Sequence, residues 1–108
     1  MATKKSKKKK SDTMSFLDEL IGEPISLGRL LEAHRLGEEM TMAEFAKILK
    51  ISASHLNDIE KGRKYLSPER AEHFAEVLGF SKQQYVRLAL QDQINRANLK
   101  YTVKLEVA

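Results

Sequence analysis

Side chains that could do chemistry are concentrated between residues 52 and 64 of this 108-residue sequence. Most of them are small, polar or charged, and none is a strong nucleophile beside a base. Such a set recognises partners by donating and accepting hydrogen bonds and by pairing with opposite charges. Its members are Ser52, Ala53, Ser54, His55, Asn57, Asp58, Lys61, Arg63 and Lys64.

The sequence contains no recognised catalytic or metal-binding motif. The histidines His34, His55 and His73 stand 21 and 18 residues apart, which is not a recognised metal-ligand spacing. Cysteine is absent, and no glycine-rich phosphate loop is present. We therefore predict no catalytic residue, no metal site, no cofactor and no enzymatic activity. His34 is interpreted as a histidine at the edge of the core and His73 as a surface residue.

The positive charge of the chain is local. Residues 1–13 carry six lysines and one aspartate, whereas the remaining residues carry 13 Lys and Arg against 14 Asp and Glu. The body of the chain is therefore not basic overall. No apolar run approaches the ~20 residues that cross a bilayer, and no secretion signal is evident. Together with the absence of cysteine, these features predict a cytoplasmic protein without a membrane partner.

Two short segments precede the main domain. Residues 1–13 are predicted to be a disordered Lys-rich tail, which serves either as a phosphate-seeking arm or as a solubilising terminus. Residues 14–24 predict a short amphipathic helix, since Ser15 and Asp18 match a capping box and Gly22 and Pro24 stop it. That helix docks either on its own domain or on a partner.

Hydrophobic periodicity predicts a domain of five helices over residues 25–95. The helices cover about residues 25–36, 41–49, 52–61, 67–79 and 81–94, with a left-handed cap expected at Gly62. Each begins at a serine or threonine: Ser26, Thr41, Ser52, Ser67 and Ser81. The predicted core consists of Leu27, Leu30, Leu31, His34, Phe45, Ala46, Leu49, Leu56, Ile59, Ala71, Phe74, Ala75, Leu78, Tyr85, Leu88 and Ala89.

Two features at the C-terminal end predict self-association. The helix at residues 81–94 has a second apolar side, and residues 101–107 alternate apolar and polar positions as a strand does. A strand without a sister in its own chain needs a partner, so residues 96–108 are interpreted as a dimerisation strand that pairs with a second copy or with another protein. The predicted dimer residues are Val86, Leu90, Ile94, Tyr101, Val103 and Leu105.

The elements that must position the polar residues 52–64 are two short helices joined by a tight corner. This arrangement is typical of a helix-turn-helix unit. Ala46 is small where the two helices would cross, and Ile51, Leu56 and Ile59 would hold the second helix from behind. The polar side of that helix would then fit the ~12 Å major groove of DNA.

At these positions the chain carries a family pattern. Over about residues 25–80 it resembles the Xre family of phage-repressor-like regulators, which implies an all-α, five-helix helix-turn-helix fold and an operator in double-stranded DNA as partner. The residues that carry the resemblance are Thr41, Glu44, Phe45, Ala46, Leu49, Ile51, Ser52, Ser54, Leu56, Ile59, Glu60, Gly62, Arg63, Ser67 and Pro68.

The resemblance also implies roles for single residues. It places Ala53, Ser54 and Asp58 against bases, and we add the amide of Asn57, whose family counterpart lies near phosphates. It implies a structural ion pair, for which Arg35 and Glu60 are the candidates. The residues implied to lie near phosphates are Thr41, Met42, Ser52, His55, Lys61, Arg63 and Lys64.

Three residues differ from those that DNA binding in this family would favour. Met42 stands where the family often has glutamine, so we expect fewer contacts with the DNA backbone there. Lys50 stands where glycine is usual, which predicts either a mildly strained left-handed corner or a corner of another shape. Asp58 is repelled by phosphate, so it either contacts a base donor such as a cytosine amine or pairs with Arg63 or Lys64.

The resemblance implies a nucleoid-associated transcriptional regulator, with repressor as the expected role. Some members are antitoxins of the HigA or HipB type, so an antitoxin with a cognate toxin protein as partner is a further expectation. HipB-like proteins carry a C-terminal strand that pairs across the dimer, and the tail of this chain is similar in kind. The alternative is a non-catalytic adaptor that uses the same scaffold to bind protein.

Overall fold

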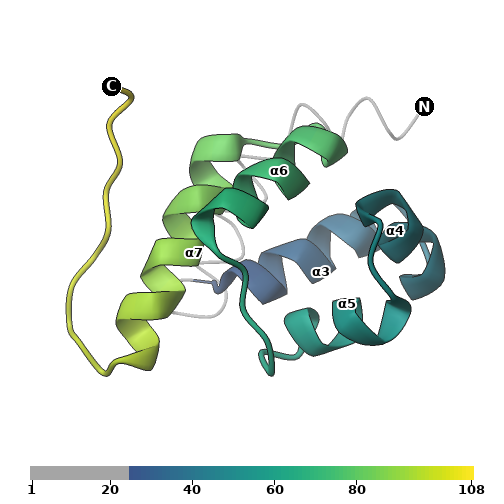
Figure 1. Ribbon diagram of the computed structural model, residues 1–108, viewed down its shortest axis with the longest axis horizontal. Helices are drawn as coiled ribbons and strands as arrows, with labels where there is room; N and C mark the ends of the chain where they lie inside the picture. Colours follow the sequence, from purple (N-terminus) through teal and green to yellow (C-terminus); the bar gives the residue numbers. More distant parts are fainter. Residues whose placement is uncertain (1–24) are drawn as a thin grey trace.

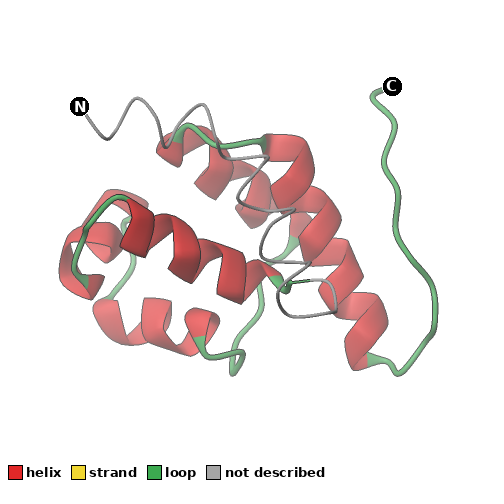
Figure 2. Cartoon of the chain, turned by 180° about the vertical axis from the view of Figure 1, so that it is seen from behind, coloured by secondary structure: helices red, strands yellow, loops and turns green. Residues whose placement is uncertain are grey.

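A computed structural model describes residues 25–108, so the predicted tail (1–13) and the predicted short helix (14–24) lie outside the described residues. The described part folds into five helices and contains no strand (Figures 1 and 2). This confirms the all-α helix-turn-helix architecture. In chain order the helices are α3 (Leu27–Gly37), α4 (Met42–Leu49), α5 (Ala53–Glu60), α6 (Pro68–Leu78) and α7 (Lys82–Arg96).

Each helix begins where its cap predicts. In all five helices the side-chain oxygen of the N-cap residue accepts a hydrogen bond from the backbone N–H three residues further on. Such a bond satisfies one of the backbone donors that the first turn of a helix leaves without a partner. The five cap residues are those predicted: Ser26, Thr41, Ser52, Ser67 and Ser81.

Two left-handed residues shape the connections on either side of α5. Gly62 has φ 81°, which confirms the left-handed position expected after this helix. Lys50 ends α4 with φ 60° and ψ 41°, so of the two predicted corner shapes the structure has the left-handed one. A side chain in that conformation costs about 1 kcal/mol relative to glycine. The corner between α4 and α5 is thus held against a small strain.

The core lies where α3 passes between the α4–α5 pair and the α6–α7 pair (Figure 1). All residues of the predicted core are buried except Leu78, which is half-buried and packs against the core, and Ile25 and Leu66 join it. His34 is 7% exposed, its ring stacks on Phe80 at 3.7 Å, and its Nδ1 is 2.7 Å from the Tyr85 hydroxyl. The interpretation of His34 as a core-edge residue is confirmed.

Helix α3 crosses α5 at a point where no side chain would fit. A Cβ atom added to Gly28 would overlap with the backbone carbonyl oxygen of Ile59. Glycine at this position therefore allows the two backbones to approach more closely than any other residue would. The crossing sets the distance of α5 from the body of the domain. Sequence periodicity gave no sign of it, since glycine inside a helix is by itself only a weak destabiliser.

The C-terminal segment corrects the prediction of a dimerisation strand. Residues 101–107 are extended but form no strand within the described chain, and they run back alongside α7 (Figures 1 and 2). The Gln91 side chain donates to the Tyr101 carbonyl at 2.8 Å and accepts from the Val103 N–H at 2.8 Å. The predicted alternation is present at Val103 and Leu105, which are half-buried between exposed neighbours, but not at Tyr101 and Val107, which are exposed. An extended segment laid on a helix produces the same period of two as a strand.

We expect Gly28→Ala to lower the free energy of unfolding by about 1–3 kcal/mol, because the added methyl group must push α3 away from α5. The control is Gly37→Ala at the other end of the same helix, where an added Cβ meets nothing within 4 Å. That variant should be as stable as the parent or slightly more stable. Urea unfolding of both variants measures the difference, and equal stability would contradict the close crossing.

Candidate nucleic-acid interface

The α4–α5 pair is a tight two-helix unit. Ala46 is buried where the helices meet, and its carbonyl accepts the Ile51 N–H at 3.0 Å. Leu56 is fully buried and Ile59 is 2% exposed, so the inner side of α5 is fixed by the core as predicted. Because α5 has only eight residues, it is too short to be stable by itself. Packing, rather than helix propensity, holds this helix in place.

The outer side of α5 remains open to solvent. Ala53 and Ser54 are exposed, whereas His55, Asn57 and Asp58 are half-buried. The structure therefore brings the four predicted base-reading residues together on one short helix, which lies at the edge of the domain below α3 (Figure 1). Small side chains at its N-terminal end leave room for the edges of bases to approach the backbone.

The hydroxyls of Thr41 and Ser52 each accept one capping hydrogen bond and can still donate one. Thr41 accepts from the Glu44 N–H while Glu44 accepts from the Thr41 N–H, which completes a capping box. Ser52 accepts from the His55 N–H at 3.0 Å. A hydroxyl that accepts one bond can still donate its own hydrogen to a phosphate oxygen. Met42, by contrast, is half-buried and packs against the core.

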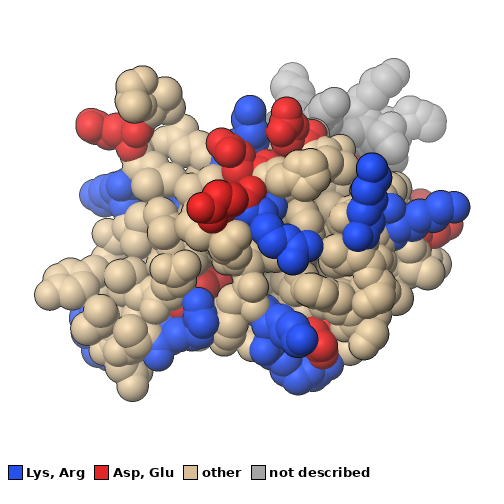
Figure 3. All heavy atoms as spheres, viewed as in Figure 1, with Lys and Arg blue, Asp and Glu red and all other residues tan. Residues whose placement is uncertain are grey.

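Asp58 forms the local ion pair that the sequence left open as an alternative. Its Oδ1 lies 2.9 Å from Arg63 Nε, and its backbone carbonyl accepts the Arg63 and Lys64 N–H groups. Because of this pair, the Asp58 carboxylate is less available to a base, and the charge of Arg63 is partly neutralised. Lys61 and Lys64 form no ion pair within residues 25–108 and carry the free positive charge. Lys and Arg side chains gather along the lower edge of the molecule, under α5 and the loop after it (Figure 3).

The predicted structural pair is present. Arg35 Nε lies 2.8 Å from Glu60 Oε2, and a second guanidinium nitrogen lies 3.1 Å from Oε1, so the contact is bidentate. Arg35 also donates to the Met40 carbonyl, and the hydrogen bond with Glu60 raises the pKa of Arg35 above its ordinary value. Glu60 is 2% exposed. The pair therefore ties the end of α5 to α3 and to the α3–α4 turn.

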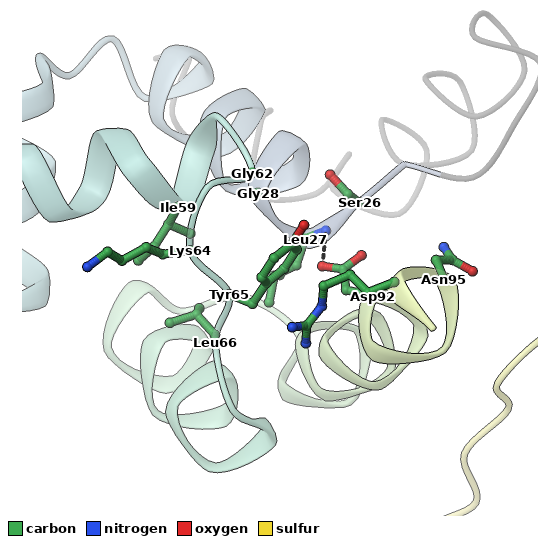
Figure 4. Close-up of a pocket in the computed structure, with 11 residues that line it drawn as sticks. Ser26, Leu27, Gly28, Ile59, Gly62, Lys64, Tyr65, Leu66, Asp92 and Asn95 are labelled. Atoms are coloured by element: carbon green, nitrogen blue, oxygen red, sulfur yellow. Dashed lines mark hydrogen bonds between the residues drawn. The ribbon is translucent and has the colours of Figure 1, made fainter. Parts of the chain in front are cut away.

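A cavity of about 280 Å³ lies behind α5, between the start of α3, the loop at residues 62–66 and the end of α7 (Figure 4). Asp92 faces this space and accepts the Leu27 N–H at 3.3 Å. Burial raises the pKa of Asp92 from its ordinary value of 3.8 to about 6. Sequence reasoning missed this residue, because a charged side chain on a helix usually reads as solvated surface.

Two other kinds of feature are absent from the described residues, a cluster of metal ligands and a membrane-spanning helix. In residues 25–108 no group of three or more His, Asp or Glu side chains is placed to hold a metal ion. His73 is exposed on α6, as interpreted from the sequence. None of the helices in the described part is both long enough and apolar enough to cross a membrane.

We expect Arg35→Ala to cost about 3–5 kcal/mol of stability, since it leaves the buried Glu60 carboxylate without its partner. The control is Arg29→Ala on the same helix, which removes a solvent-exposed pair with Glu32 and should cost no more than about 1 kcal/mol. Thermal unfolding separates the two variants. A folded Arg35→Ala protein that changes its DNA sequence preference would show that the pair has more than a structural role.

The raised pKa of Asp92 predicts a pH-dependent stability. The folded state holds this proton more tightly than the unfolded state, so the contribution is full below about pH 4 and is lost as pH rises through 6. Asp92→Asn should abolish this loss and stabilise the protein at pH 7.5 by up to about 3 kcal/mol. Urea unfolding at pH 4 and pH 7.5 tests it. The control Glu76→Gln removes an exposed charge and should keep the pH dependence of the parent.

The comparison with known protein families agrees with this geometry. No match to the chain was found among curated proteins or among solved structures. The sequence profile of the family described as "Helix-turn-helix domain" matches residues 26–88, which span α3 to α6 and the first half of α7. The match confirms the helix-turn-helix part of the predicted resemblance. The chain belongs to the helix-turn-helix domain family.

Proposed function

We propose that the protein binds double-stranded DNA in a sequence-specific manner and acts as a transcriptional repressor in the cytoplasm, at the nucleoid. The observation that carries this proposal is the division of α5 into a buried side and an open side. Leu56 and Ile59 are fixed in the core, while Ser54 is exposed and Asn57 is half-buried on the same helix. Membership of the helix-turn-helix domain family supports it.

In this proposal α5 lies in the major groove and its surroundings contact the backbone. Ser54 and Asn57 carry hydrogen-bonding groups, which can distinguish base edges, while Ala53 can contact a thymine methyl group. Lys61 and Lys64 stand beside the end of α5, where they would neutralise phosphates and release counterions. The hydroxyls of Thr41 and Ser52 keep a hydrogen to donate to phosphate oxygens.

The size of α5 supports binding as a homodimer. Eight helical residues span about 12 Å, which covers only three or four base pairs. Two copies related by a two-fold axis would read half-sites about 34 Å apart and double the recognised sequence. Of the predicted dimer residues, Val86, Leu90 and Ile94 are half-buried on α7. They are not among the residues packed against the core. The C-terminal segment covers part of this side, since Val86 shares a hollow with Leu105 and Val107, so a second copy would contact what the segment leaves open.

An antitoxin role has less support than repression. Beside the family resemblance, it depends on the predicted short helix at residues 14–24, which lies outside the described residues, and on a C-terminal strand available to a partner. Residues 101–105 are instead bonded to Gln83 and Gln91 of the same chain. The function we propose is therefore the binding of DNA itself.

We expect Ser54→Ala and Asn57→Ala each to weaken binding to a selected duplex by about 1 kcal/mol or more, with no loss of folding. The duplex would come from selection of a random double-stranded library with the full chain, and the recovered sequences should be two-fold symmetric. Titration by fluorescence anisotropy gives the affinities. The control is Gln93→Ala, an exposed polar residue on α7 that should change nothing.

One result would favour the protein-binding adaptor instead. If selection recovers no sequence, and binding to arbitrary duplex DNA loses its salt dependence once residues 1–13 are removed, then α5 and its lysines do not contact DNA. A regulator retains a salt slope from Lys61, Arg63 and Lys64 after that truncation.

A further inference from the structure

Tyr65 and Arg96 form a contact that joins the loop after α5 to the end of α7. The guanidinium carbon of Arg96 lies 3.8 Å from the centroid of the Tyr65 ring. Both residues line the cavity behind α5 together with Lys64 and Asn95. Arg96 therefore lies beside the loop that carries Lys64, although 32 residues of chain separate the two.

The stack leaves the hydrogen-bonding edge of Arg96 open. A guanidinium that stacks on a ring uses its flat face, whereas its N–H donors point outward in the plane. Arg96 is exposed and forms no ion pair within residues 25–108. Asp92, one helical turn earlier, interacts electrostatically with Arg96, but its Oδ2 accepts the Leu27 N–H and the two side chains form no ion pair. The Tyr65 side chain is also exposed at 45%, so the pair can be reached from solvent.

We propose that the Tyr65–Arg96 pair is a second contact with the DNA backbone, outside the helix-turn-helix, in which Arg96 binds a phosphate next to the one held by Lys64. The proposal rests on the proposed function, since it extends the footprint of the DNA that α5 would read. The end of α7 lies on the same side of the molecule as α5 and the loop after it (Figure 1), so one duplex could contact both.

A backbone phosphate fits this position better than a small free anion does. A small anion that entered the cavity would meet the carboxylate of Asp92, which repels it. A duplex that lies against α5 would instead bring its phosphates to the outer edge of Arg96, where the fork of N–H groups suits bidentate binding. The ring of Tyr65 fixes the guanidinium beforehand, so less rotamer entropy is lost on binding.

The test is the salt dependence of binding to the selected duplex, measured with the full chain. For Arg96→Gln we expect the slope of log K against log salt to fall in magnitude by about 0.9, the value for one lost phosphate contact. Arg96→Lys should restore most of the slope, because it keeps the charge. The control is Arg87→Gln, which removes the same charge nine residues earlier, on the opposite side of α7 at 100° per residue.

The outcomes separate a phosphate contact from a structural role. If Arg96→Gln lowers affinity at all salt concentrations without changing the slope, or if Arg96→Lys fails to restore the slope, the stack only positions the loop and the proposal is overturned. An unchanged slope in Arg96→Gln also overturns it. If at the same time Ser54→Ala and Asn57→Ala still weaken binding, the proposed function stands and only the extended footprint fails.

Discussion

The close crossing of α3 and α5 is the constraint on which the rest of the candidate interface depends. Gly28 lets the backbones touch at the Ile59 carbonyl, and Arg35, about two turns further along α3, binds the neighbouring Glu60 carboxylate. An eight-residue helix cannot maintain its own position in water. These two contacts hold the C-terminal end of α5 against α3, and the buried Leu56 turns its apolar side inward, so that its polar side faces outward.

Buried polar groups act in this domain as connections between helices. Glu60 on α5 binds Arg35 on α3, Tyr85 on α7 binds His34 on α3, and Asp92 on α7 receives the first N–H of α3. Burial raises the pKa of the Tyr85 phenol, so the phenol stays protonated beside His34. Each pair would be costly to separate, because its members lie away from water. Helix α3 is thereby the common partner, and α5 is oriented through it.

Local chemistry explains why much of the fold could be predicted. Each N-cap acts within three residues of itself, and each apolar stripe repeats within its own helix, so both are visible along the chain. The pair of Arg35 and Glu60 came from the family resemblance. The roles of Gly28 and Asp92 could not be predicted from the sequence, because they depend on which helices meet. The tail was predicted wrongly as a strand, since alternation does not say what lies against it.

The manner in which Gln91 holds the C-terminal segment determines which substitutions that segment tolerates. The amide bonds to the carbonyl of Tyr101 and the N–H of Val103, and Gln83 bonds to the carbonyl of Leu105. All three contacts are with main-chain atoms of the segment. Every residue type has the carbonyl, and every type except proline has the N–H, so substitutions within the segment keep these bonds. Substitutions of the exposed Thr102 and Lys104 should therefore leave this segment in place, whereas substitutions of the two glutamines on α7 should release it.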